Sequence, residues 1–91
     1  MSNFLLNIGH SNVVAADKII SIVNPNSEPI KRLRSEASER GLLVDATQGK
    51  RTLSIIVMSS GHIIESFLGL KALTDKFNAI FGYKNYEDDH H

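Results

Sequence analysis

The chain lacks cysteine and tryptophan, has only two prolines, and carries no net charge. Without cysteine, neither a disulfide framework nor a thiolate-bound metal can stabilise the fold, and the composition is compatible with the cytoplasm. No apolar run reaches the length of a membrane-spanning helix, about 18 residues. Residues 1–7 also lack the basic and apolar stretches of a secretory signal peptide. We therefore expect a cytoplasmic protein that has no membrane partner.

The length and composition predict a small globular subunit. The chain has 91 residues, of which 42% are hydrophobic and 22% are charged, as in ordinary folded domains. A domain of this size buries only about 60% of its unfolded surface, so its core is marginal. No linker or internal repeat divides the sequence, and we treat residues 1–91 as one domain. Association with further copies of the chain is the expected source of additional stability.

The zero net charge hides two unequal regions. Ten basic and ten acidic side chains balance, whereas many nucleic-acid-binding domains are strongly basic. Residues 30–51 nevertheless hold six basic side chains against three acidic ones, a surplus of three. The basic residues of this region are Lys31, Arg32, Arg34, Arg40, Lys50 and Arg51. Because an acidic stretch, 87–89, lies near the end of the chain, a neutral total does not exclude a locally basic surface.

Alternating and β-branched residues predict a strand-rich domain. The strands are expected over residues 4–8, 12–16, 18–23, 42–45, 52–58 and 62–67. Turn residues around Gly49 and Gly61 predict two hairpins that share the strand 52–58.

Two helices complete the predicted fold. The first runs over residues 28–40, with Ser27 as its N-cap and Gly41 as its stop. The second runs over residues 70–81, where apolar residues recur at helical spacing before Gly82. Residues 83–91 show no periodicity and predict a loose tail, whose final His90-His91 fits either a native end or the remnant of a tag. The sequence thus predicts an α+β domain with a small mixed sheet and two helices.

The segment Gly49-Lys50-Arg51-Thr52 is the first candidate for a binding site. It is not a P-loop, because Val44 stands where that motif needs a glycine and Arg51 follows the lysine directly. What remains is a tight turn with two adjacent cations, which can straddle phosphate oxygens, the lysine as a point charge and the arginine as a fork. The alternative is a solvated turn with two ordinary surface charges.

The first predicted helix carries a second basic cluster. Lys31, Arg32 and Arg34 lie close together, and at least part of this cluster must face solvent. It fits either a phosphate-contacting face or the charged outer face of an amphipathic helix.

No arrangement of residues predicts catalysis. His10 and His62 are expected near strand ends, with Asp45 and Ser60 as conceivable companions. However, no metal-binding histidine spacing and no Gly-X-Ser-X-Gly segment is present. We therefore expect no enzyme, no catalytic residue, no metal, no cofactor and no small-molecule substrate.

The order of residues along the chain also carries a family resemblance. The matching stretches are Asn7-Ile8-Gly9, Asn12 to Ala16, Ile22 to Arg32, Ala37, Arg40 to Thr47, Gly49 to Thr52, Val57-Met58, Ser60, His62 to Ile64, and Ser66. Over about residues 4–67, without a gap, they resemble the RemA family, the small bacterial extracellular-matrix regulatory proteins. Residues 68–91 diverge from the usual family tail.

The resemblance implies a DNA-binding transcriptional regulator of biofilm and matrix genes, without catalytic activity. It implies subunits that assemble into a homo-oligomeric ring, with a DNA-binding mode like that of LytTR-type domains. The family's basic positions fall on Lys18, Lys50 and Arg51, two of which are lysines here in place of arginines. Lysine keeps the charge but loses the bidentate fork, which favours phosphate contact over base reading. His10-Ser11 also departs from the family's aromatic–glycine pair.

Two functions from different classes follow. The first is a homo-oligomeric regulator that contacts double-stranded DNA through Lys18, Lys50 and Arg51, with Lys31 and Arg32 as the next candidates. The alternative is an oligomeric scaffold or adaptor that binds a protein partner, through its divergent C-terminal helix, without DNA binding.

Overall fold

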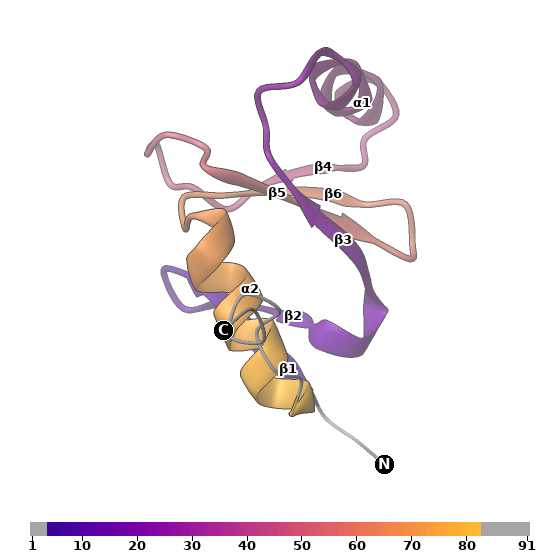
Figure 1. The fold of residues 1–91 in the computed structure, drawn as a ribbon. Coiled ribbons are helices and arrows are strands. Elements are labelled where there is room, and N and C mark those ends of the chain that lie inside the picture. Colours follow the sequence, from indigo (N-terminus) through magenta and orange to yellow (C-terminus); the bar gives the residue numbers. More distant parts are fainter. Residues whose placement is uncertain (1–3, 83–91) are drawn as a thin grey trace.

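The computed structural model describes residues 4–82 and arranges them in three layers (Figure 1). A four-stranded sheet forms the middle layer. The helix α1 (Glu28–Glu39) covers one of its faces, while a two-stranded hairpin and the helix α2 (Leu70–Phe81) cover the other. The predicted α+β class, with a mixed sheet and two helices, is confirmed. None of the helices in the described range is long and apolar enough to cross a membrane. The predicted tail, 83–91, lies outside the described residues.

The sheet has the strand order β3-β5-β6-β4. Its strands are β3 (Ile19–Val23), β4 (Leu43–Asp45), β5 (Ser54–Met58) and β6 (Ile63–Ser66). β5 pairs antiparallel with both β3 and β6, whereas β4 pairs parallel with β6. β3 and β4 are therefore the two edge strands, and β5 and β6 lie between them.

The predicted hairpin around Gly61 is confirmed, but the one around Gly49 is wrong. β4 pairs with β6 and not with β5, and its Val44 stands opposite Ile64. The reason lies in α1, which follows β3 and carries the chain back along the sheet, so that β4 runs in the same direction as β3. The segment from 46 to 53 is therefore not a hairpin turn. It crosses the end of β6 to reach β5, and we call it the basic loop.

The hairpin of β1 (Leu5–Gly9) and β2 (Asn12–Ala15) forms a separate two-stranded sheet. A short 3-10 helix (Ala16–Lys18) then turns the chain into β3. The sequence predicts Ala16 as the end of one strand and Lys18 as the start of the next, but both residues belong to this helix. Ala16 is fully buried, and its N–H donates to the carbonyl oxygen of Phe4 at 2.7 Å. Because Ala16 is fixed in the core, Lys18 lies in this connection and not at the start of a strand.

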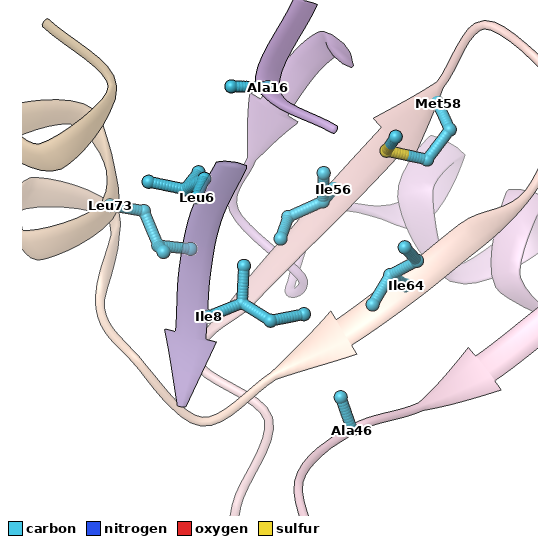
Figure 2. Close-up of a cluster of buried hydrophobic side chains, with 8 residues drawn as sticks. All are labelled: Leu6, Ile8, Ala16, Ala46, Ile56, Met58, Ile64 and Leu73. Atoms are coloured by element: carbon cyan, nitrogen blue, oxygen red, sulfur yellow. The ribbon is translucent and has the colours of Figure 1, made fainter. Parts of the chain in front are cut away.

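The larger part of the core lies between the four-stranded sheet and the β1–β2 hairpin with α2 (Figure 2). Its buried side chains come from four strands or their ends, the 3-10 helix and α2: Leu6, Ile8, Ala16, Ala46, Ile56, Met58, Ile64 and Leu73. Alternate residues of β1 point into this core, so Leu6 and Ile8 are buried while Leu5 and Asn7 are exposed. A second core lies under α1, around Ala37, Ile55 and Ile63.

The ends of α1 are those that the sequence predicts. The Ser27 hydroxyl oxygen accepts a hydrogen bond from the Ile30 N–H at 3.4 Å, as an N-cap does. The helix ends at Glu39, one residue before the predicted end, and Gly41 follows with φ 74°. Its buried side packs on Ile55 and Ile63, so its exposed side carries Lys31 and Arg32.

Candidate nucleic-acid interface

Both ends of the basic loop are tied to the end of β6. The Ala46 N–H donates to the Glu65 carbonyl oxygen at 2.9 Å, and the Leu53 N–H donates to the Ser66 carbonyl oxygen, also at 2.9 Å. These bonds follow from the route of the chain across β6. The loop is therefore held at both of its ends, and its middle residues, 48–51, are exposed.

A turn inside the basic loop sets the position of its cations. The Lys50 N–H donates to the Thr47 carbonyl oxygen at 3.1 Å, which closes a turn around Gln48 and Gly49. Both central residues have positive φ, 51° and 85°, so a glycine suits the second position. Thr47, the first residue of the turn, is buried, whereas Lys50 and Arg51 are exposed.

Asp45 fixes the position of Thr47 at the start of this turn. Its Oδ1 accepts hydrogen bonds from the Thr47 hydroxyl at 2.6 Å and from the Thr47 N–H at 2.8 Å. The Thr47 hydroxyl, helped by the Thr47 N–H, lowers the pKa of the Asp45 carboxyl below its usual value. The carboxylate is thus engaged within the loop and remains charged at neutral pH.

Lys50 and Arg51 are exposed, and within residues 4–82 neither of them forms an ion pair. The ion pairs among residues 4–82 use other cations, namely Lys31, Arg34 and Lys71. Lys50 Nζ instead lies 5.4 Å from the centroid of the Phe67 ring, which supports it from the β6–α2 connection. The two side chains are therefore available to an anionic ligand.

Lys18 is exposed but lies at the other end of the sheet. Its carbonyl oxygen accepts the Ser59 N–H at 2.7 Å, which places it beside the β5–β6 turn. The basic loop lies at the start of β5. The first and last of the five residues of this strand are four steps of about 3.3 Å apart, which is about 13 Å. Figure 1 shows the two ends on opposite sides of the molecule. One subunit therefore does not bring Lys18 together with Lys50 and Arg51.

The predicted helix cluster divides into exposed and structural residues. Lys31 and Arg32 are exposed on α1, in the layer opposite the β1–β2 hairpin, and Lys31 Nζ lies 3.8 Å from Glu28. Arg34 points inward instead, and its Nη2 and Nε lie 2.7 and 3.0 Å from Oε2 of Glu65 on β6. Arg34 thus joins α1 to the sheet and is not a free cation.

The residues considered for catalysis do not come together. Ser60 Oγ lies 2.7 Å from Nδ1 of His62 at the β5–β6 turn, whereas Asp45 stands at the opposite end of β4 beside Thr47. Within residues 4–82, no three His, Cys, Asp or Glu side chains could hold a metal ion.

The sequence did not reveal which residues surround the basic loop. Phe67 contacts Gly9 and His10 of the β1–β2 turn as well as Lys50, although these residues are far apart in the sequence. Local periodicity marked Phe67 only as the end of a strand. No local signal indicates this contact, because it depends on where the hairpin docks on the sheet.

Comparison with known proteins finds similarity over most of the chain. Residues 5–77 match the RemA-like family, described as extracellular matrix regulatory protein A-like. A protein of Desulfosudis oleivorans is 47% identical over 85 residues, covering 93% of this chain and 88% of the relative. A protein of Synechococcus sp. strain JA-3-3Ab is 49% identical over 77 residues, covering 85% of this chain and 86% of the relative. A protein of Oleidesulfovibrio alaskensis is 51% identical over 73 residues, covering 80% of this chain and 87% of the relative. The names of all three class them as regulatory proteins. The predicted resemblance is confirmed, and the chain belongs to the RemA-like family.

Proposed function

We propose that this regulatory protein is a cytoplasmic DNA-binding transcriptional regulator of extracellular-matrix genes, and that it acts as a homo-oligomer. The observation that carries the proposal is the basic loop. Its two ends are fixed to β6, and it presents Lys50 and Arg51 without a carboxylate partner in the described part of the chain. The contact is made to DNA phosphates.

The chemistry of the loop suits a phosphate backbone. Lysine acts as a point charge and arginine as a planar fork, so adjacent residues can contact neighbouring phosphate oxygens. Because the loop is already held in place, little conformational entropy is lost when it binds. Each phosphate neutralised contributes about −0.9 to the slope of log K against log salt, so the contacts are strongly salt-dependent.

Assembly into a ring supplies the number of contacts that one subunit lacks. A single loop offers two cations, whereas a ring repeats the same loop around its rim and sums weak contacts. The separation of Lys18 from Lys50 and Arg51 within one subunit fits this arrangement, because Lys18 then adds a separate contact or joins the basic loop of a neighbour. A LytTR-like mode of binding is part of the same proposal.

The test is the double substitution Lys50→Ala/Arg51→Ala, measured by fluorescence anisotropy with labelled genomic duplexes. We expect DNA binding to be lost, and the salt slope of any residual binding to be flatter. Both side chains are exposed, so their truncation should cost under about 0.5 kcal/mol of stability. Size exclusion of the same variant should therefore show unchanged assembly.

The matched control removes two cations from another face. Lys31→Ala/Arg32→Ala changes the charge by the same amount on α1, and we expect it to bind DNA nearly as well as the unmodified protein. If Lys31→Ala/Arg32→Ala loses DNA binding while Lys50→Ala/Arg51→Ala keeps it, the DNA interface lies on α1 and not on the basic loop. An unmodified protein that binds no duplex at low salt would contradict DNA binding altogether.

The adaptor alternative has less support. It relies on α2 as an exposed docking helix, but the apolar side of α2 packs on its own subunit. Leu73 is fully buried, and Phe77, Ile80 and Phe81 lie against the same core. A protein partner would have to bind the polar side of this helix.

A further inference from the structure

The β1–β2 turn holds two residues in the left-handed backbone region. His10 has φ 52° and Ser11 has φ 64°, values that suit a two-residue hairpin turn but are strained for most side chains. Asn7 fixes the entry to the turn, because its Oδ1 accepts the Gly9 N–H at 2.7 Å. The direction of the His10 side chain is therefore set by an ordered turn.

Phe67 joins this turn to the basic loop. Its ring packs so closely on Gly9 that a β-carbon there would lie 2.8 Å from Cζ. The His10 ring lies against the Phe67 ring, with centroids 4.4 Å apart and the two planes tilted by 47°. Lys50 Nζ lies over the same ring. The turn, the β6–α2 connection and the basic loop lie on the same side of the molecule (Figure 1), so His10 and Lys50 share one aromatic support.

The surroundings of His10 are basic, and its ring nitrogens form no hydrogen bond within residues 4–82. Lys50 lies on the same phenyl ring, and Lys76 Nζ of α2 lies 3.4 Å from the carbonyl oxygen of Asn7. Asp45, at the foot of the basic loop, is engaged by Thr47. A histidine in an exposed position gains its positive charge between about pH 8 and pH 5. A bound phosphate stabilises the charged form of a histidine.

We propose that His10 is a further phosphate contact on the same surface as Lys50 and Arg51, and that it strengthens DNA binding as the pH falls. The inference rests on the proposed function, because the ligand is the same phosphate backbone. Protonated His10 adds a cation to the surface that carries Lys50 and Arg51, and its free N–H can donate to a phosphate oxygen.

The experiment measures binding of a labelled mixed-sequence duplex by anisotropy at pH 6.0 and pH 8.0 with constant ionic strength. We expect the unmodified protein to bind several-fold more tightly at pH 6.0. Its salt slope should also be steeper there, by up to about 0.9 for each subunit in contact. His10→Asn, which tolerates positive φ, should lose most of both differences. His10→Phe should lose them as well, because it keeps an aromatic ring on Phe67 but carries no proton.

The matched control is His62→Asn, at the opposite end of the sheet, which should keep the full pH dependence. His10→Lys should bind at pH 8.0 about as tightly as the unmodified protein binds at pH 6.0, because its charge is permanent. If His10→Asn and His10→Phe both keep the pH dependence while Lys50→Ala/Arg51→Ala abolishes binding, the inference about His10 is wrong and the proposed function stands. If the unmodified protein binds no duplex at either pH, both proposals are wrong.

Discussion

At the scale of single residues, the site depends on side chains that position others. Asp45 and Thr47 carry no ligand contact in the proposal, yet they fix the turn from which Lys50 and Arg51 project. Gly9 has a comparable role, because only a residue without a β-carbon leaves room for the Phe67 ring at φ 109°. In the proposed site, uncharged and paired residues thus hold the charged residues in place.

Asp45 should make the stability of the protein depend on acid pH. The Thr47 hydroxyl and N–H lower the pKa of Asp45 in the folded state, so the unfolded chain binds the proton more readily. The resulting stabilisation is present at pH values above the ordinary pKa of aspartate. It is lost as the pH falls through the lowered pKa that Asp45 has in the folded protein. We expect Asp45→Asn to be less stable than the unmodified protein at pH 7, with the difference gone near pH 2. Urea unfolding at both pH values measures this, and parallel losses of stability in the two proteins would contradict it.

At the scale of secondary-structure elements, the sequence predicts each helix and strand better than it predicts their partners. The bounds of α2 are those expected, because periodic apolar residues before Gly82 are a local signal. The pairing of β4 is not local, because it depends on where α1 returns the chain, and the predicted hairpin at Gly49 was wrong for this reason. The same limit applies to the site. The exposure of Lys50 and Arg51 could be predicted from their turn, but the contact of Phe67 with His10 could not.

The ion pair between α1 and β6 should stabilise the fold. Glu65 is almost fully buried, so Arg34→Met leaves a desolvated carboxylate without its partner and should cost about 1–3 kcal/mol in urea unfolding. Replacing both residues by Met should recover part of this loss, because no charge is then left unpaired. Lys31→Ala is the control, since its exposed pair with Glu28 is worth at most about 1 kcal/mol. An Arg34 variant as stable as this control would show that the buried pair contributes nothing.

At the scale of the whole molecule, the open surfaces are consistent with a subunit of something larger. Among residues 4–82, the exposed large apolar residues are Leu5, Val13, Ile20, Val44 and Leu53. Two of them lie on the edge strands, Ile20 of β3 with 66% of its surface exposed and Val44 of β4 with 43%. β3 and β4 form the two opposite edges of one sheet, and both strands run in the same direction. The β3 edge of one copy could therefore pair in parallel with the β4 edge of the next, which would continue the sheet.

Self-association should therefore depend on these edges. Light scattering after size exclusion should give a mass of several subunits at micromolar concentration, and a clean monomer would contradict the proposed assembly. Ile20→Lys/Val44→Lys places charge on both edges, which blocks pairing between strands, so its mass should fall toward that of a single chain. Ala72→Lys, on the exposed side of α2, adds a lysine away from the edges and should keep the full mass. In the proposed assembly, affinity for DNA sums over the repeated basic loops, so the edge variant should also bind DNA more weakly with Lys50 and Arg51 intact. An edge variant that is monomeric but binds DNA as tightly as the assembled protein would show that single subunits suffice.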